Sequence, residues 1–401
     1  MKRLIQIAIA LIFCCVSLHA QIDTTKTQAP RISLITCHAG SVMYELCGHS
    51  AIRIQDGIND IAVNYGLFEF QAENFVLKFL KGETDYRVGA YPFDVFMHHY
   101  LKENRQVIEQ HLNLTPQQAQ KVIFLLYENL RPENAIYRYN YVKNNCATKP
   151  IDIIEKAIND TICFSDPKID GAKNWTYRDE MRYFHKNYLW YQFGIDLALG
   201  SGVDYHLSTR EKMFAPEALE SMMRGATITD SLGNKIPLVT GETIINNGTP
   251  AQLSPTPIII SPSMIFYILL GITLVITIRD IKKRQVTKWY DTTIFGTFAL
   301  VSLLMSFLIF VSVNEATSPN YLYLWLNPLC FIPAICIWIK KSSKIVTLYH
   351  AINIVALILL LIILSCGIHR GNVAFTPLII ISLLRSISNI YITQCNIKKT
   401  K

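Results

Sequence analysis

Cysteines, metal-ligand clusters and nucleic-acid motifs are all sparse in this chain of 401 residues. Between the apolar run at the start of the chain and the long apolar segments that begin at residue 262, only four cysteines occur, Cys37, Cys47, Cys146 and Cys163. The roughly 240 residues that precede the apolar segments are enough to bury a core without disulfide staples. In an oxidising compartment Cys37 could still pair with Cys47, and Cys146 with Cys163. The spacing of His, Cys and carboxylate residues offers no metal site, so we expect no metal and no cofactor.

The formal net charge of +8 is the next feature to explain. No aromatic-basic patch or nucleic-acid motif accompanies it, so nucleic acid is not an expected partner. The basic residues instead flank apolar segments in the last third of the chain. The charge is therefore mainly a signal of membrane topology.

The first twenty residues are typical of a secretory signal peptide. A basic Met-Lys-Arg start is followed by an apolar run over 4–16 and by Leu18-His19-Ala20 before Gln21. Cys14 and Cys15 lack the small residue that a lipid-attachment cysteine needs just before it. We therefore expect cleavage after residue 20 and no lipid anchor.

Apolar stretches of about twenty residues, the length that crosses the hydrocarbon core of a bilayer, recur from 262 to 393. We expect five transmembrane helices, at 262–278, 293–313, 321–339, 345–365 and 373–393. Lysine and arginine gather in the loops 279–288 and 340–344 and at the C-terminal end, whereas the loops 314–320 and 366–372 have almost none. The positive-inside rule then places residues 21–260 outside the cytoplasmic membrane, in the periplasm.

The exported part reads as an α+β domain. Strands are expected at 31–36, 50–54, 60–65, 101–114 and 137–142, with a turn at 55–57. Helices are expected at 116–130, after a Thr115 cap and a proline, and at 146–158, capped by Asn144 or Asn145. We divide the chain into a signal peptide (1–20), a Cys/His catalytic domain (21–165), an accessory part (166–246), a proline-rich linker (247–261), the transmembrane helices (262–393) and a cytoplasmic tail (394–401).

Cys146 is the candidate nucleophile. In the first turn of a helix, free backbone N–H groups and the positive end of the helix dipole would stabilise its thiolate, and the same amides could hold an oxyanion. His49, at the start of a strand after Gly48, is the candidate acid and base. Asn64, on the neighbouring hairpin strand, could orient the imidazole, with Tyr65 and Asn145 as competitors for this role or for substrate contacts.

Two arginines are weaker site candidates. Arg53 shares a strand face with His49 if side chains alternate, so it could contact a lipid headgroup or a structural carboxylate. Arg370, beside His369 in an outward loop, could hold a lipid phosphate or simply anchor the end of a span. Arg385, inside the last span, lies near enough to the cytoplasmic end to reach water, and we assign it no function. The aromatic stretch 188–193 suits either a membrane interface or a core helix.

A histidine followed later by Asn-Cys at a helix start resembles the circularly permuted papain-like (NlpC/P60-like) hydrolases and acyltransferases, the group that includes lecithin:retinol acyltransferase. More closely, the chain resembles the Bacteroides-type lipoprotein N-acyltransferase family over nearly the whole of its mature length. The shared motifs are Gly48-His49-Ser50-Ala51-Ile52-Arg53, Asn64-Tyr65-Gly66-Leu67-Phe68, Gly82 with Tyr86, Tyr139-Asn140-Tyr141, Asn145-Cys146-Ala147-Thr148, several positions in 175–216, and the multi-span end.

This resemblance implies a permuted papain-like domain followed by a helical transmembrane bundle. It also implies that an acyl chain moves from a membrane phospholipid, through a Cys146 thioester, to the α-amine of a diacylglyceryl-cysteine lipoprotein. The partners would be a phospholipid donor, a diacylated lipoprotein acceptor and the membrane itself. A papain-like envelope peptidase or amidase would use the same Cys146 and His49, and an envelope scaffold with a disulfide-bonded Cys146 is the non-enzymatic alternative.

Overall fold

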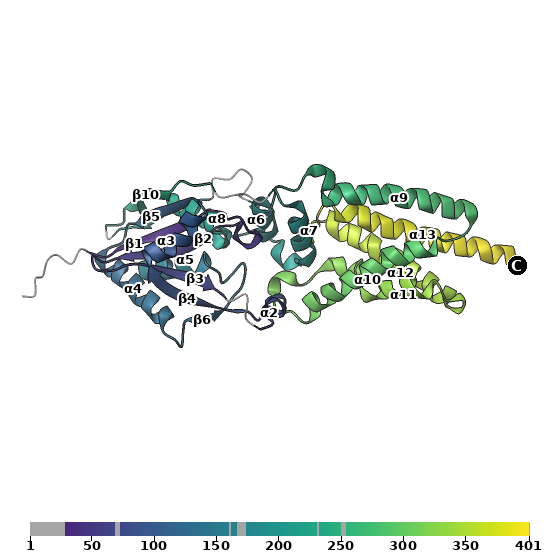
Figure 1. The fold of residues 1–401 in the computed structure, drawn as a ribbon, viewed down its shortest axis with the longest axis horizontal. Helices are drawn as coiled ribbons and strands as arrows, with labels where there is room; N and C mark the ends of the chain where they lie inside the picture. Colours follow the sequence, from purple (N-terminus) through teal and green to yellow (C-terminus); the bar gives the residue numbers. More distant parts are fainter. Residues whose placement is uncertain are drawn as a thin grey trace, which may run out of the picture.

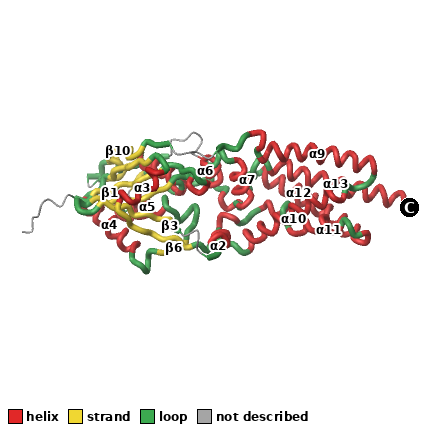
Figure 2. Tube along the Cα trace, viewed as in Figure 1, coloured by secondary structure: helices red, strands yellow, loops and turns green. Residues whose placement is uncertain are grey.

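The computed structural model describes residues 29–68, 73–159, 162–166, 174–230, 232–249 and 254–400. The expected signal peptide lies outside these residues. The described chain forms two parts placed end to end, a part that contains the sheet and a wholly helical part (Figures 1 and 2). This mixed α/β domain followed by a helical segment confirms the predicted fold class at that level.

The main sheet has seven antiparallel strands in the order β10-β5-β1-β2-β3-β4-β6. The strands are β1 (Arg31–Cys37), β2 (His49–Gln55), β3 (Asp60–Leu67), β4 (Asp85–Pro92), β5 (Val107–Leu112), β6 (Ile136–Arg138) and β10 (Val239–Asn246). The first three agree with the predicted strands. In a strand, successive side chains point to opposite faces of the sheet, so alternating apolar residues indicate a strand. The turn predicted between the last two of them joins β2 to β3 as a hairpin.

Helices cover both faces of this sheet. On one face α4 (Pro116–Leu130) and α5 (Thr148–Ile158) pack Val122, Leu126 and Ile153 against Ile52 and Ile54 of β2. On the other face α3 (Phe93–Lys102) packs its aromatic residues against Ala51 and Ala62. The alternate residues of β2 therefore belong to two separate cores, which fixes the register of the hairpin.

Two strand predictions were too long. Within 101–114 only β5 is a strand, because residues 101–102 complete α3, whose Phe93, Phe96, Met97 and Tyr100 recur at helical spacing and are buried. Within 137–142 only the end of β6 is extended, and the chain then turns toward Cys146. The helix at 116–130 is confirmed, and Thr115 forms a full capping box with Gln118.

The rest of the exported part is built from short elements. They are α2 (Phe75–Lys81), α6 (Tyr177–Phe184), α7 (Leu189–Ala198), α8 (Pro216–Arg224), the small sheet of β7 (Ile162–Cys163), β8 (Thr227–Thr229) and β9 (Lys235–Pro237), and the 3-10 turns η1 (Met43–Glu45), η3 (Ser201–Val203), η4 (Glu211–Phe214) and η5 (Ile258–Ile260). Of these, α2 and α7 lie between the sheet and the helical part (Figure 1). They are therefore the elements that connect any site in the sheet domain to the membrane.

The helical part contains four helices long and apolar enough to span a membrane, not five. These are α9 (Pro262–Lys283), α10 (Lys288–Phe310), α12 (Ser343–Ser365) and α13 (Phe375–Thr400). The expected helix at 321–339 is instead broken into η7 (Tyr321–Leu324), η8 (Pro328–Cys330) and α11 (Phe331–Cys336), with η6 (Glu315–Thr317) and η9 (Lys340–Ser342) on either side. Asn327 caps η8 and Pro328 cannot donate a backbone hydrogen bond, so a continuous helix stops there.

The broken segment still runs from one end of the bundle to the other. At its start, the Val313 amide donates to the Lys81 carbonyl of the exported part at 2.8 Å. At its end, Trp338 Nε1 donates to Thr292 Oγ1 near the beginning of α10 at 2.8 Å. The chain thus passes along the bundle five times, four times as a long helix, and the lysine-poor loops lie beside the exported domain as the charge pattern predicts.

Arg385 does not reach water, which corrects our expectation. Its side chain is fully buried in the bundle, where Nε donates to Asp291 Oδ1 at 2.6 Å and Nη2 donates to Asp280 Oδ2 at 2.9 Å. Nη1 donates to Thr277 Oγ1 at 3.0 Å. Two carboxylates on α9 and α10 therefore hold the guanidinium of α13 inside the bundle.

Candidate active site

A cavity of about 560 Å³ opens at the end of the sheet that faces the bundle. Cys146, His49 and Asn64 all line it. Most of its remaining wall is aromatic or aliphatic, made by Met43, Tyr44, Leu67, Phe68, Phe75, Val76, Phe79, Tyr86, Tyr100, Tyr139, Tyr141 and Tyr191. Cavities of about 300–1,000 Å³ with a few polar groups on an apolar wall are typical ligand sites.

Asn145 fixes the position of Cys146. Its Oδ1 accepts the amides of Ala147 and Thr148 at 2.8 and 2.9 Å, which starts α5 at Thr148. Its Nδ2 donates to the carbonyls of Tyr141 and Phe214 at 2.7 and 2.8 Å. Cys146 therefore lies in the turn just before the helix rather than in its first turn. Asn145 does not line the cavity; its hydrogen bonds hold the turn that carries Cys146.

His49 lies between Asn64 and Cys146. Its Nε2 is 2.6 Å from Asn64 Oδ1, so Nδ1 is left to face the thiol. Gly66 lies beside both residues, where a Cβ would make ordinary van der Waals contact with Cys146 Cβ at 3.6 Å and with His49 Cε1 at 3.9 Å. Its φ of +90° is the backbone conformation that favours glycine at this position. The structure therefore brings together the three residues that the sequence proposed as nucleophile, base and orienting group.

The thiol and the imidazole change each other's pKa. Burial by itself would raise the pKa of Cys146, but the charge of His49 and a hydrogen bond from it lower the pKa below its ordinary value of 9.0. Burial by itself would lower the pKa of His49, but the Cys146 thiolate and the hydrogen bonds to Cys146 and Asn64 raise the pKa above 6.5. Each group therefore favours the charged form of the other, which promotes transfer of the thiol proton to the imidazole.

The helix amides expected to hold an oxyanion are already used. Asn145 Oδ1 takes the amides of Ala147 and Thr148, and the Asn145 carbonyl takes that of Lys149 at 3.1 Å. The amides that reach the Cys146 sulfur are those of Ser50 and of Cys146 itself. These two N–H groups are the better candidates for oxyanion donors, because they point at the atom that is acylated.

The other candidates in the sheet domain lie away from the cavity wall. Tyr65 is buried, and its hydroxyl accepts from Asn129 Nδ2 at 2.7 Å. Arg53 shares the strand face of His49, as alternation predicts, but its guanidinium covers Phe93 at 3.6 Å. Arg53 also binds Asp60 Oδ1 at 2.7 Å and Glu109 Oε2 at 2.8 Å, which is the structural carboxylate role.

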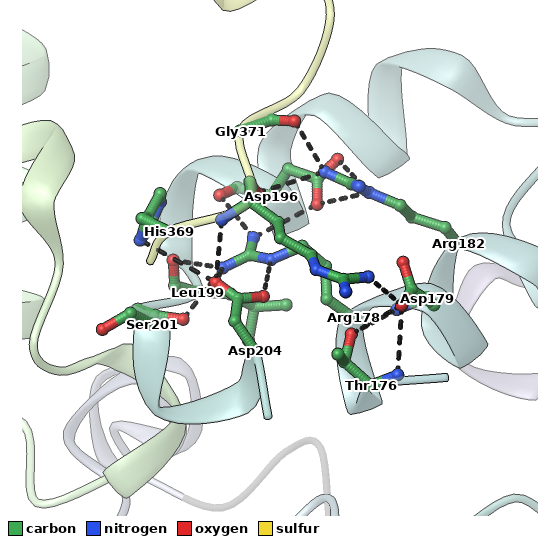
Figure 3. A network of polar contacts seen from close by, with 12 residues as sticks. Thr176, Arg178, Asp179, Arg182, Asp196, Leu199, Ser201, Asp204, His369 and Gly371 are labelled. Atoms are coloured by element: carbon green, nitrogen blue, oxygen red, sulfur yellow. Dashed lines mark hydrogen bonds and ion pairs between the residues drawn. The ribbon is translucent and has the colours of Figure 1, made fainter. Parts of the chain in front are cut away.

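Arg370 belongs to a polar network between the exported domain and the bundle, in which Figure 3 labels Arg178, Asp179 and Asp204. Its side chain pairs with Asp179 of α6, and its amide donates to Asp204 Oδ2 at 3.0 Å. At the centre, the buried Arg178 donates to Asp204 Oδ1 at 2.6 Å and to Asp196 Oδ1 at 3.2 Å. Arg370 therefore anchors the loop between α12 and α13 to the exported domain.

The same network reaches that loop from a second side. Arg182 Nη2 donates to the Gly371 carbonyl at 3.0 Å, and Asn372 Nδ2 donates to Asp196 Oδ2 at 2.7 Å (Figure 3). Burial lowers the pKa of His369 to about 4, so this histidine is neutral within the network. The contacts fix α7, which carries Asp196, against the bundle.

The aromatic wall is the part of the site that sequence reasoning missed. Tyr86 and Tyr139 stack at 4.0 Å, and Tyr100 stacks beside His49 at 6.4 Å. Tyr86 and Tyr139 stood in motifs of the family resemblance, but no spacing rule connects them to Cys146. Tyr191 belongs to the aromatic stretch 188–193, whose Phe193 packs against Phe266 and Phe375 of the bundle. That stretch thus lines the cavity through Tyr191 and packs against the bundle through Phe193.

One group among the described residues has the geometry to hold a cation. Ligand atoms of Glu45, His99 and Glu103 lie within 4.8 Å of one another. The Arg105 guanidinium already lies 3.2 Å from Glu45 Oε1 and 3.6 Å from Glu103 Oε2. Because this arginine already balances the carboxylates, we assign the group no cofactor.

The cysteines of the described chain are all free thiols. Cys37 is buried beside His49 on β1, and burial raises its pKa well above the ordinary value. Cys47 lines the cavity, but burial raises its pKa to about 12. Cys163 is exposed on β7. In contrast to Cys37 and Cys47, Cys146 has a lowered pKa and a histidine partner.

Comparison with known families gives two matches. Residues 18–178 match the model described as the Lnb N-terminal periplasmic domain, and residues 254–397 match the Lnb transmembrane domain. No curated protein and no solved structure matches the chain. The two matched segments cover the cavity, most of its wall and the whole bundle, in the order that the structure shows.

Proposed function

This chain belongs to the Lnb-type lipoprotein N-acyltransferase family, and we propose that it transfers a fatty acyl chain from a phospholipid, through a thioester on Cys146, to the α-amine of a diacylglyceryl-cysteine lipoprotein. Membership makes it a membrane enzyme of lipoprotein modification with a periplasmic domain. The donor, the acceptor and the thiol chemistry are our proposal.

The observation that carries this proposal is a thiol paired with an imidazole in an aromatic cavity beside the bundle. Cys146 and His49 meet there, and each favours the charged form of the other. A peptidase that acts on soluble envelope peptides has no use for an apolar wall that is continuous with a membrane domain. An enzyme whose amphiphilic substrates stay in the bilayer does need such a wall.

In the first half-reaction the Cys146 sulfur attacks the ester carbonyl of the phospholipid. The oxygen of the tetrahedral intermediate accepts hydrogen bonds from the amides of Ser50 and Cys146. The C–O bond then breaks, and the His49 imidazolium gives its proton to the departing oxygen. The products are a lysophospholipid, the Cys146 thioester and a neutral His49.

In the second half-reaction the α-amine of the acceptor attacks the thioester carbonyl. Neutral His49 takes the proton that the amine loses, and the C–S bond breaks to release the thiolate. The amide product leaves, and the thiolate–imidazolium pair is restored. Asn64 Oδ1 holds His49 Nε2 throughout, so the same Nδ1 serves both half-reactions.

Trapping the intermediate tests this function. Purified protein in phospholipid vesicles, without acceptor, should carry a fatty acyl mass on the peptide that contains Cys146, and hydroxylamine should remove it. Adding a diacylated lipopeptide should discharge the acyl group and convert the lipopeptide to its triacylated form. Cys163→Ser is the matched control, because that exposed thiol should not change the result. Peptide cleavage without a thioester would overturn the proposal in favour of an amidase.

A further inference from the structure

The short helix α2 has an unusual composition for the surface of an exported domain. Five of its seven residues are apolar, and none of the seven is buried. Val76 and Leu77 are more than half exposed, at 68% and 52%. An apolar helix that packs against no core of its own marks an interaction surface.

The position of α2 places this surface at the outer end of the bundle. The Lys81 carbonyl accepts the amide of Val313, the third residue after α10, at 2.8 Å. Gly82, with a φ of +75°, lets the chain pass so close that a Cβ there would lie 2.9 Å from the Asn314 amide nitrogen. Phe310 and Val313 are also exposed. Because α2 lies beside this end of the bundle (Figure 1), the exposed apolar residues of the bundle continue onto α2.

The other side of α2 lines the cavity that contains Cys146. Phe75, Val76 and Phe79 belong to its wall. From there a row of stacked rings leads inward: Phe79 to Phe75 at 6.2 Å, Phe75 to Phe68 at 5.5 Å, Phe68 to Tyr86 at 4.9 Å, and Tyr86 to Tyr139 at 4.0 Å. Tyr86 and Tyr139 lie close enough for the charge of the Cys146 thiolate to act on their hydroxyl groups.

We propose that α2 lies in the outer-leaflet interface and forms the side entrance through which the acyl chain of the phospholipid donor passes from the bilayer to Cys146. This entrance rests on the proposed function. Apolar side chains of interfacial helices enter the headgroup and acyl boundary to a depth of about 5–10 Å. The exposed Lys78 is placed to meet lipid phosphates while its stem covers apolar surface.

Photo-crosslinking tests the placement without any turnover. The benzophenone amino acid p-benzoylphenylalanine replaces Leu77 in the Cys146→Ala variant, reconstituted in vesicles of radiolabelled phosphatidylethanolamine and phosphatidylglycerol. The matched control carries the same amino acid at Ile58, an exposed residue in the β2–β3 turn at the far end of the hairpin. Lipid crosslinking at Leu77 should exceed that at Ile58 by at least about tenfold. Equal yields, or crosslinks to acceptor protein instead of lipid, would overturn the placement.

A kinetic test addresses entry. Leu77→Asp should lower the rate of Cys146 acylation from vesicle phospholipid relative to the rate from soluble p-nitrophenyl butyrate by at least about tenfold, because an aspartate in the interface opposes membrane docking. Ile58→Asp should leave this ratio at the wild-type value. A ratio unchanged in Leu77→Asp would reject the entrance. If the wild type forms no thioester from phospholipid, the proposed function fails, and the crosslinking yields alone decide where α2 lies.

Discussion

The exported domain and the membrane bundle each bury a pair of oppositely ionisable groups, and the two sites differ in how completely these groups are paired. In the bundle, Arg385 has three hydrogen-bonded partners, among them both Asp280 and Asp291. In the exported domain, the Cys146 thiolate has one imidazole partner and faces a cavity. A fully paired buried charge holds helices together, whereas a partly paired one at a cavity is available for chemistry.

The difference predicts that the two sites respond oppositely to substitution. Removing a group from the cavity should remove activity and leave the fold. Removing Arg385 should destabilise the bundle, since a guanidinium that binds α9, α10 and α13 together has no route to substrate. Four experiments would break or sharpen this comparison.

The largest effect is expected for Cys146. Cys146→Ala and His49→Ala should each lower acyl transfer by about 10³-fold or more, because no other described thiol near the cavity has a lowered pKa. Mass spectrometry of lipopeptides measures the loss. The melting temperature in detergent should stay near the wild-type value, and a large drop would mean that the pair is structural.

Arg385→Met should come next. It leaves Asp280 and Asp291 buried without their cation, which costs about 3–5 kcal/mol of stability. Thermal unfolding in detergent measures this cost. Lys283→Met is the matched control, because Lys283 is exposed on the same helix as Asp280 and should have little effect. Combining Arg385→Met with Asp280→Asn and Asp291→Asn should recover part of the loss, and no recovery would contradict the pairing.

Asn64→Ala should have an intermediate effect on rate. It removes the acceptor that holds His49 Nε2 at 2.6 Å. A hydrogen bond to a charged group contributes about 1.5–3 kcal/mol, which corresponds to a loss of about tenfold to a hundredfold in kcat. Asn64→Gln keeps the amide but moves it away from His49. Asn129→Ala is the control, because it removes the hydrogen bond to the Tyr65 hydroxyl and leaves His49 unchanged. Equal losses in Asn64→Ala and Asn129→Ala would show that packing, not orientation, is measured.

The smallest effect is expected from pH. The thiolate forms as pH rises through the lowered pKa of Cys146, and the imidazolium is lost as pH rises through the raised pKa of His49. The rate of acylation should therefore follow a bell whose limbs belong to the pair. Asn64→Ala should move the alkaline limb to lower pH, because Asn64 raises the pKa of His49. A profile that keeps rising above the ordinary thiol pKa would exclude a preformed ion pair.

Local signals predicted most of the exported core correctly. Alternation in 31–65 gives β1, β2 and β3, and Thr115 followed by Pro116 gives the start of α4. Asn145 predicts the start of α5 to within two residues. The helix expected at 321–339 was based on apolar length alone and left out Pro328, where the structure breaks it. The strand expected at 101–114 was too long, because helix α3 ends inside it and only β5 is a strand.

The contacts between distant segments could not be predicted in this way. Arg53 and Arg370 face carboxylates from other elements, Asp60 and Glu109 for one and Asp179 for the other. Arg385 was expected to reach water, yet two aspartates on other helices hold it. In each case the partner is set by which helices and strands pack side by side, and a single sequence does not contain that packing.

By itself the sequence determined the division into an exported domain and a membrane part, and it marked Cys146 and His49 as reactive residues, because hydrophobic length, charge flanking and caps act within short stretches of chain. Only the tertiary structure decided that His49 meets Cys146 across Gly66, that the amides of Ser50 and Cys146 face the sulfur, and that α2 connects the cavity to the bundle. Those arrangements depend on the packing of a sheet against helices from distant segments, and this packing sets the distances and the burial on which reactivity depends.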